Sequence, residues 1–327
     1  MMFNEIPKGM ERRLFPANYL KREIFSPPEE MPVQHEGVWI REVWRSEMAD
    51  FIIKRNIKAL YLQASWSWGI TDYSFLGNLK YLKKLIVTSG DKADLSSIEN
   101  LSELEELSLT CPTPTNINFE KFGNLKYCYV SWWKGAEKIF DCKWLKSLYL
   151  DGRKNKDYSS LSGMADLEVL TLANTPIEHL DRIRSLDKLE KVELLNCRKL
   201  CDIKALGSLK CLRWLTIDGS KLIDDLSVLA GLKNLEYLNV TGLGEVKSLV
   251  PLEALKKLKA VTFCGSTNIV DGDLTPLTVL PNLGMLNFVG KRHYTHRLIK
   301  NWSWDNFNLP DILLQKKEKG VRALELR

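Results

Sequence analysis

The stretch LRWLTIDGSKLIDDLSVLAGLKNLEYLNVTG, residues 212–242, contains the pattern that decides the fold. It opens on a six-residue motif, L-x-x-L-x-L with Ile in the last place, and the motif returns as LEYLNV at Leu235. Between the two copies, apolar residues fall at every third position, at Leu226, Leu229 and Leu232. A spacing of three matches the three residues per turn of a 3₁₀ helix rather than the 3.6 of an α-helix. The stretch therefore predicts a short strand, a 3₁₀ turn and a second strand.

The same motif occurs eleven times along the chain, with Ile, Val, Phe or Cys replacing Leu in some places. Its copies begin at Ile57, Leu82, Leu104, Leu125, Leu145, Leu167, Leu189, Leu212, Leu235, Leu258 and Leu283. Neighbouring copies start 20 to 25 residues apart. The eighth residue of the unit is Gly or Asn in seven copies, and both types tolerate the positive φ that a chain leaving a short strand can need. These seven are Gly152, Asn174, Asn196, Gly219, Gly242, Gly265 and Gly290.

This unit resembles the bacterial leucine-rich repeats of the internalin type, and the resemblance covers about residues 57 to 290. It implies an α/β leucine-rich-repeat solenoid, with a curved parallel β-sheet on the concave face and 3₁₀ or short helical turns on the convex face. That family usually carries Asn at the ninth position, where the side chain bonds to the backbone. Here only the copies with Ser, Thr or Cys at the ninth position can partly replace these bonds. Repeats three to five carry Pro112, Trp133 and Arg153 at that place and should be the least regular.

The repeats divide the chain into three segments. Residues 1–56 are expected to form an N-terminal cap, a helix or a hairpin whose apolar residues cover the open end of the array. Residues 57–290 hold the eleven repeats, and residues 291–327 form a C-terminal cap and basic tail. In that last segment Trp302, Trp304 and Phe307 can seal the far end, and residues 311–327 form a short amphipathic helix or are frayed.

Composition narrows the classes of function. The net charge is +6, from 47 basic and 41 acidic residues, and residues 291–327 carry five of those six charges. The repeats are close to neutral, which argues against a nucleic-acid footprint along them. No signal peptide and no stretch of 18 apolar residues is visible, so no membrane partner is expected. Seven cysteines without framework spacing favour a reducing cytoplasm.

The sequence contains no nucleophile elbow, HExxH, P-loop or GxGxxG motif, so it predicts neither an enzyme nor a cofactor. Several single features allow two interpretations. His293 and His296 are spaced like half of a metal site, but nothing nearby completes it, so a structural or solvated pair in a basic patch is favoured. Cys197 suits the ninth position better than a redox or zinc role. Trp132 and Trp133 follow a strand directly and either form an interaction tip or pack under an irregular loop.

In this arrangement the third, fifth and seventh residues of the unit point out of the concave face, while the first, fourth and sixth point inward. The outward places carry two groups of aromatic side chains on neighbouring strands, with charged and polar residues between or beside them. Exposed aromatics with interspersed charge are the composition of a binding hot spot, although large side chains on a sheet also simply pack on one another. The candidate partner-binding residues are Tyr127, Tyr129, Tyr149, Asp151, Lys191, Glu193, Trp214, Asp218, Tyr237 and Asn239.

These observations predict a non-catalytic scaffold that binds another protein through its concave face. A concrete version is a bacterial immunity or antagonist protein that sequesters a toxin or effector. One alternative is a regulatory subunit that binds a phosphatase or another enzyme, since eukaryotic arrays of similar spacing do so. A remote alternative is a secreted effector or enzyme, which would need a sizeable further domain. The partner's identity, the face that binds and the oligomeric state stay open, because fold does not imply function.

Overall fold

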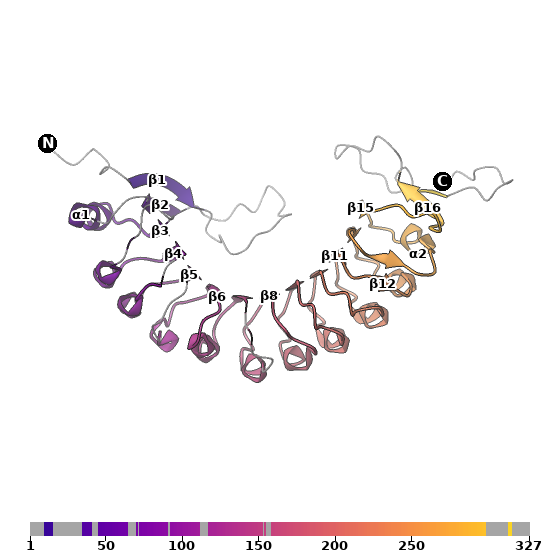
Figure 1. Cartoon of the computed structure of the whole chain (residues 1–327), viewed down its shortest axis with the longest axis horizontal. Helices are drawn as coiled ribbons and strands as arrows, with labels where there is room; N and C mark the ends of the chain where they lie inside the picture. The colour runs from indigo at the N-terminus through magenta and orange to yellow at the C-terminus, as the bar shows by residue number, and fades with distance from the viewer. Residues whose placement is uncertain are drawn as a thin grey trace. The chain divides into compact units, whose positions relative to one another are not determined.

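The computed structural model describes most of the chain. The described residues are 10–15, 35–40, 45–64, 70, 72–90, 92–111, 117–152, 154, 158–298 and 313–315. They fall into two compact units, Met1–Arg153 (unit 1) and Lys154–Arg327 (unit 2), and each is considered by itself. In each unit the strands lie along one side, called here the sheet side, and the short helices lie along the other, the turn side (Figure 1).

Unit 1 contains seven strands in chain order, and all neighbours after β1–β2 pair in parallel. The strands are β1 (Met10–Phe15), β2 (His35–Ile40), β3 (Ala59–Ala64), β4 (Lys84–Ser89), β5 (Glu106–Thr110), β6 (Tyr127–Ser131) and β7 (Ser147–Asp151). The helices are α1 (Ser46–Lys54) and the 3₁₀ helices η2 (Ser74–Asn78), η3 (Ser96–Asn100), η4 (Phe119–Lys121) and η5 (Ala136–Asp141).

Unit 2 continues the same arrangement with six parallel strands on its sheet side. They are β8 (Val169–Ala173), β9 (Lys191–Leu195), β10 (Trp214–Asp218), β11 (Tyr237–Asn239), β13 (Ala260–Phe263) and β15 (Met285–Phe288). The turn side carries η6 (Ser159–Gly163), η7 (Asp181–Ile183), η8 (Lys204–Ser208), η9 (Ser227–Gly231), η10 (Val250–Ala254) and α2 (Thr275–Thr278). Two small pairs complete the unit: β12 (Glu245–Val246) with β14 (Asn268–Ile269), and β16 (His296–Leu298) with β17 (Leu313–Gln315).

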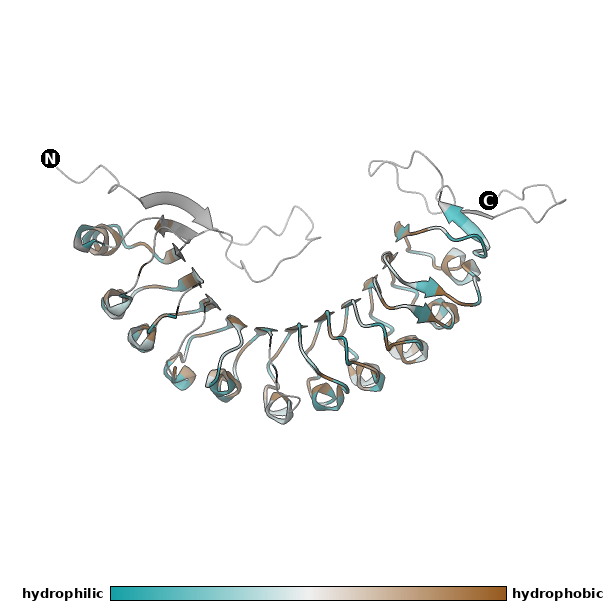
Figure 2. Cartoon of the chain, viewed as in Figure 1, coloured by the Kyte–Doolittle hydropathy of each residue, from teal (hydrophilic) through white to brown (hydrophobic). Residues whose placement is uncertain are grey.

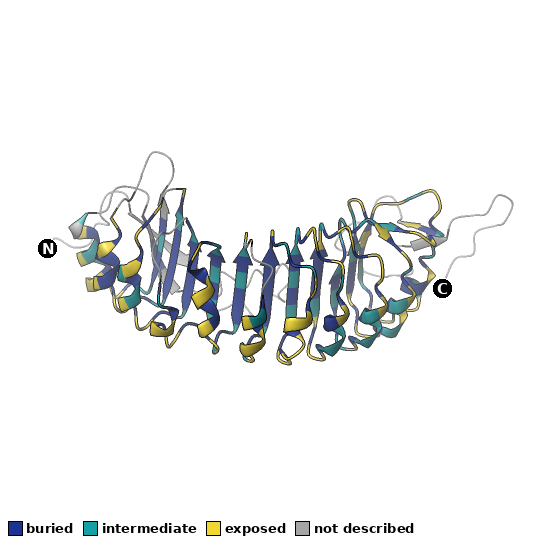
Figure 3. Cartoon of the chain, turned by 60° about the horizontal axis from the view of Figure 1, so that its bottom comes forward, coloured by how far each residue is buried: buried dark blue, intermediate teal, exposed yellow. Residues whose placement is uncertain are grey.

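The predicted short strand forms in all eleven copies of the motif, and the predicted 3₁₀ turn forms in most of them. Each copy contains a strand that begins at its third residue, and a 3₁₀ helix follows in nine of them among the described residues. Between β13 and β15 the helix is instead a single α-helical turn, α2. The inward positions form the core: Leu212, Leu215 and Ile217 are fully buried, as is Leu229 on the turn side. The strands are mostly buried and the short helices carry exposed residues (Figure 3), with hydrophobic and hydrophilic residues mixed along each turn (Figure 2).

Side-chain capping explains where several 3₁₀ helices begin. An aspartate two residues earlier accepts the backbone N–H of the first helical residue, as Asp225 does from Ser227 at 2.8 Å and Asp202 from Lys204 at 2.8 Å. This bond satisfies a backbone donor that a short helix otherwise leaves without a partner. The capping aspartate therefore determines where the 3₁₀ helix begins, while the leucines determine which of its faces is buried.

The predicted positive φ at the eighth position is confirmed in six copies and wrong in one. The φ angles lie between 52° and 77° at Gly152, Asn174, Asn196, Gly219, Gly242 and Gly265. In four of these copies the backbone N–H of the eighth residue donates to the backbone carbonyl of the seventh residue in the next copy, as Gly219 does to Thr241 at 3.0 Å. Gly290 does not have a positive φ. It ends the last repeat, and the chain runs on into a turn in which the Tyr294 N–H donates to the Lys291 carbonyl.

The ninth-position bonds to the backbone are partly replaced, as predicted. The Cys197 thiol lies 3.4 Å from the Leu172 carbonyl and 3.5 Å from the Thr175 hydroxyl. Ser220 is an exception, because its buried hydroxyl has no partner among the described residues. Of the three substitutions predicted to make repeats three to five irregular, Pro112 and Arg153 lie outside the described residues.

The ends differ in how well they were predicted. The N-terminal cap combines both predicted forms, since β1 and β2 pair antiparallel and α1 follows, and β2 also pairs in parallel with β3. At the other end the sequence left two alternatives for residues 311–327, a short amphipathic helix or a frayed end. Residues 313–315 form neither, because they pair as β17 with β16. Trp302, Trp304 and Phe307 lie outside the described residues.

Candidate functional site

The candidate residues all lie on the sheet face, defined here as the third, fifth and seventh motif positions of the strands. In unit 1 they come from β6 and β7, and in unit 2 from β9, β10 and β11. Nine of the ten are half-buried and Asp218 is exposed. Half-burial follows from their setting, because each side chain stands beside side chains of a neighbouring strand about 4.8 Å away.

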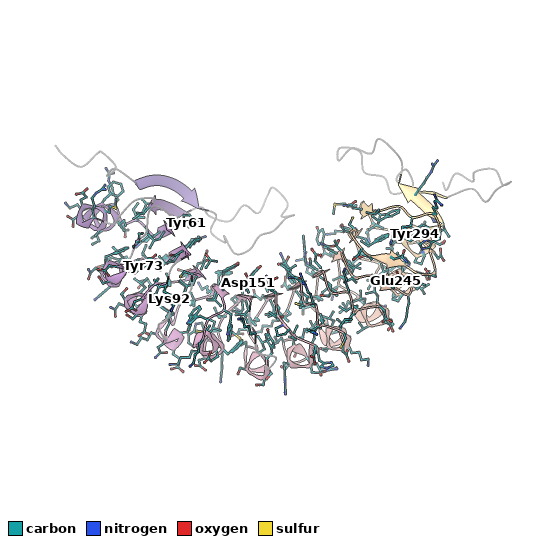
Figure 4. The ribbon with its side chains drawn as sticks, viewed as in Figure 1. Tyr61, Tyr73, Lys92, Asp151, Glu245 and Tyr294 are labelled. Carbon is teal, nitrogen blue, oxygen red and sulfur yellow. The ribbon has the colours of Figure 1, made fainter. Side chains whose placement is uncertain are left out.

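Unit 1 holds a stacked pair of tyrosines. Tyr129 and Tyr149 are register partners on β6 and β7, and their ring centroids are 4.2 Å apart at an interplanar angle of 24°. Tyr127, the third tyrosine of this predicted group, lies on β6 two residues before Tyr129, with Glu106 and Ser147 as its register partners on β5 and β7. Asp151, labelled in Figure 4, lies at the end of β7, and its backbone carbonyl accepts the Trp132 N–H at 2.7 Å.

Unit 2 holds a more elaborate cluster. The rings of Trp214 and Tyr237 lie 4.8 Å apart at 30°, and the Lys191 ammonium lies 4.8 Å from the Trp214 ring centroid. Glu193 accepts from Lys191 at 3.3 Å, and the Trp214 indole N–H donates to Thr216 at 3.1 Å. The indole is thus fixed from three directions, which lowers the entropy that a binding partner would have to remove.

Two further predicted residues stand beside this cluster without joining it. Asp218 is exposed at the end of β10, and its backbone carbonyl accepts a hydrogen bond from the Asn196 N–H at 2.6 Å. Asn239 accepts a hydrogen bond from Thr241 at 2.6 Å. Both therefore border the aromatic pair on the side of the strand ends.

Comparison with solved structures matches this arrangement. An internalin (InlF) of Listeria monocytogenes superposes with a TM-score of 0.55 at 20% identity, covering 79% of this chain and 83% of the internalin. A leucine-rich-repeat protein of Leptospira interrogans gives a TM-score of 0.52 at 18% identity over 74% of each chain. The chain has the leucine-rich-repeat fold. At these identities the likeness concerns the fold alone.

Sequence comparisons add one relative. The Disease resistance protein UNI of Arabidopsis thaliana is 26% identical over 195 residues, which are 58% of this chain and 19% of the plant protein. The chain therefore corresponds to less than a fifth of that relative's length. No family model matches the chain.

The two tryptophans after β6 differ in their surroundings. Trp133 is buried among the leucine-rich-repeat core residues, 6.3 Å from the Phe119 ring, so the packing interpretation describes it. Trp132 is half-buried, and its ring lies 6.2 Å from Phe140. Neither residue projects as a free tip.

The histidines of the C-terminal cap have structural partners. His293 Nε2 lies 2.8 Å from the Ile269 carbonyl, and buried His296 lies 2.8 Å from the Thr295 hydroxyl. Between them Tyr294 (Figure 4) is buried, and its hydroxyl accepts the Ile269 N–H at 3.0 Å. Within the described ranges, no three His, Cys, Asp or Glu side chains are grouped as metal ligands. None of the described helices has the length and apolar character needed to cross a bilayer.

Sequence reasoning missed a ladder of charges at the second position of the leucine-rich repeats. In unit 1, Glu105 accepts from Lys83 at 2.7 Å and from Lys126 at 3.3 Å. In unit 2, Glu236 accepts from Arg213 at 2.7 Å and from Lys259 at 2.5 Å. The signal was present, because ten of the eleven aligned copies carry an acidic or basic residue at this position, and both signs occur.

This ladder predicts an acid-sensitive contribution to stability. Burial raises the pKa of Glu236, but the hydrogen bonds from Arg213 and Lys259 outweigh it and hold the pKa below its ordinary value. A lowered carboxylate pKa adds stability above the ordinary value of 4.5, and this stability is lost as the pH falls through the folded-state pKa. Glu236→Gln should therefore cost about 1–2 kcal/mol near neutral pH and progressively less in acid, measured by urea unfolding.

Glu253→Gln is the matched control for this prediction, because Glu253 is an exposed carboxylate on η10. It should change the free energy of unfolding by less than about 0.5 kcal/mol at any pH. A Glu236→Gln deficit that is as large at pH 3 as at pH 7 would show that the lost stability does not come from the ionised carboxylate.

A second missed feature is a buried ion pair on the sheet face of unit 1. Lys84 and Glu106 occupy the third position in register on β4 and β5, and the Lys84 ammonium lies 2.6 Å from the Glu106 carboxylate. Their side chains are only 2% and 8% exposed. Burial lowers the pKa of Lys84, and the charge and hydrogen bond of Glu106 oppose this. Side chains at the third position were expected to be accessible to a partner, but those of Lys84 and Glu106 are buried.

Proposed function

We propose that this chain is a non-catalytic scaffold that binds another protein through its sheet face. The observation that carries the proposal is the fixed Trp214–Tyr237 pair under the Lys191 ammonium. Trp and Tyr dominate binding hot spots, and a pair already held in place loses little freedom when a partner arrives. Tyr129 and Tyr149 supply a second stacked pair of the same kind in unit 1.

The concrete version is an immunity or antagonist protein that sequesters a toxin or effector in the cytoplasm. All seven cysteines are free, which supports a reducing compartment. Burial also raises the pKa of the Cys142 thiol to about 12 and that of Cys111 to about 11, so these thiols are unreactive at neutral pH.

Site-specific photo-crosslinking in cells of the source organism tests the binding face. A photoreactive residue at Thr262, on the sheet face beside Asn239, should capture the partner, whereas one at Ser227 on η9 should not. Trp214→Ala should weaken the captured partner's affinity by about thirtyfold, the size of a hot-spot loss. Capture from Ser227 alone would move the site to the turn side.

Tyr81→Ala is the matched control, because Tyr81 is an aromatic residue that is 62% exposed and lies off the sheet face. It should change the affinity by less than about twofold. If Tyr81→Ala weakened binding as much as Trp214→Ala, the aromatic pair would have no special role.

Co-expression tests the immunity version separately. The wild-type chain should relieve the toxicity of the protein encoded beside it, and Trp214→Ala should not. Absence of relief would remove the immunity version while leaving the sheet-face binding proposal intact. A captured phosphatase whose activity changes on binding would instead identify the chain as a regulatory subunit.

A further inference from the structure

Unit 2 carries a row of lysines at one edge of its turn side. Lys210, Lys233 and Lys256 each directly follow a buried leucine and are 23 residues apart. The same offset of 23 separates the register partners Trp214, Tyr237 and Ala260 on β10, β11 and β13. The three lysines therefore occupy equivalent places in successive repeats. Lys257 stands next to the third, and these four residues are called the lysine row.

The structure holds the lysine row in place through neutral groups. The Asn234 side chain donates to the Lys210 carbonyl at 2.8 Å and accepts from the Lys257 ammonium at 2.8 Å. The other three ammonium groups donate to backbone carbonyls of Gly207, Ala254 and Val279 at 2.6, 3.4 and 3.3 Å. An ammonium has three donors, so each lysine keeps further hydrogen-bonding capacity.

The surroundings of the lysine row are also basic. None of its four ammonium groups forms an ion pair with a carboxylate in the described parts of the chain. Arg213 and Lys259 border it, each more than half exposed, and share Glu236 between them. Glu190 lies 3.8 Å from Arg213. Asp187 holds the place equivalent to Lys210 in the preceding repeat and is exposed. Six cations thus face three carboxylates along this edge, which leaves it a positively charged rim.

This rim adjoins the aromatic pair on the sheet face. Arg213 directly precedes Trp214, and Glu236 directly precedes Tyr237. Protein interfaces combine an aromatic centre with a polar, charged rim, and the two features stand here in that relation. A protein that covers the aromatic pair can reach the lysine row with the residues at its own margin.

We propose that the lysine row binds an acidic segment of the protein that the sheet face holds. This inference rests on the proposed function, because it assumes that the lysine row and the sheet face contact the same partner. A single-stranded nucleic acid fits less well, because the repeats as a whole are close to neutral, whereas nucleic-acid sites lie on extended basic surfaces.

Fluorescence anisotropy with a labelled 20-residue polyglutamate peptide at low salt tests the row directly. The full chain should bind the peptide, and Lys233→Gln/Lys256→Gln/Lys257→Gln should weaken binding about tenfold. The control Arg182→Gln/Lys199→Gln/Lys221→Gln removes three exposed charges elsewhere in unit 2 and should weaken it less than about twofold. Both variants retain the basic tail, so its contribution is common to all measurements.

Three results would overturn the inference. The first is no peptide binding by the wild-type chain at low salt. The second is equal weakening in the two triple variants, which would show that only net charge matters. The third is tighter binding of a 20-nucleotide oligothymidylate, or of phosphatidylserine vesicles, that the row variant abolishes. That result would assign the row to a phosphate-bearing partner.

The sheet-face variant separates this inference from the proposed function. Trp214→Ala should leave polyglutamate binding within about twofold, because the peptide has no apolar side chain to place on the rings. Failure of peptide binding with intact crosslinking from Thr262 removes the lysine row alone. Intact peptide binding without crosslinking from Thr262 removes the sheet-face proposal and the claim of one shared partner.

Discussion

Replacing Lys84 with methionine is expected to destabilise unit 1 by about 3–5 kcal/mol. The substitution removes the cation and leaves the Glu106 carboxylate buried, with its side chain only 8% exposed. An uncompensated buried charge costs more than the pair itself contributes, because the pair has already lost its hydration. Urea unfolding followed by far-UV circular dichroism measures the loss, and repeat arrays require a check that unfolding is two-state.

The double variant Lys84→Met/Glu106→Leu is the control for this first prediction. It removes both charges and fills the space with apolar side chains, so its stability should lie within about 1 kcal/mol of wild type or above it. A double variant as unstable as Lys84→Met would contradict the interpretation. It would mean that the charges are needed for other contacts and not only for one another.

Glu106→Leu alone adds a second readout, the dependence of stability on pH. Burial already lowers the pKa of Lys84, and this variant removes the carboxylate that opposes the lowering. A lysine whose folded-state pKa is depressed binds fewer protons in the folded chain than in the unfolded chain. The stability of Glu106→Leu should therefore rise as the pH is raised through the folded-state pKa toward the ordinary value of 10.5.

The fold follows almost entirely from local periodicity. Because each motif copy buries the same three positions, the copies must stack in register, and the strands form where the motif predicts them. The same reasoning placed Tyr129 beside Tyr149 and Trp214 beside Tyr237, since equal motif positions become register partners.

Burial on the sheet face is not a local property, and here sequence reasoning was less successful. The third position is half-buried at Trp214 but closed at Lys84, although the motif is the same. The positive φ at the eighth position likewise occurs in copies that are followed by a further strand of the same sheet, and Gly290 ends the copy whose strand, β15, is the last of that sheet. Whether the aromatic pairs bind a partner is a further question that depends on a second molecule.

Trp133→Ala is expected to destabilise unit 1 by about 3–5 kcal/mol, the usual loss when a buried tryptophan leaves a cavity. Trp133 is 7% exposed, and its ring lies 6.3 Å from Phe119, which itself packs edge-on against Phe122 at 6.0 Å. The shortened side chain would leave a cavity beside the Phe119 ring. Far-UV circular dichroism in urea measures the change without relying on tryptophan fluorescence.

Trp133→Phe separates the ring's packing from its N–H group. The Trp133 indole nitrogen is buried and has no hydrogen-bond partner among the described residues, so it contributes a desolvation penalty rather than a bond. Phenylalanine keeps an aromatic ring and removes that unpaired donor, so this variant should lose less than about 1.5 kcal/mol. If Trp133→Ala left stability unchanged and weakened partner binding instead, Trp133 would be a contact residue. The buried position among the phenylalanines would then be a poor guide to its role, and the aromatic surface of unit 1 would have to extend beyond its sheet face.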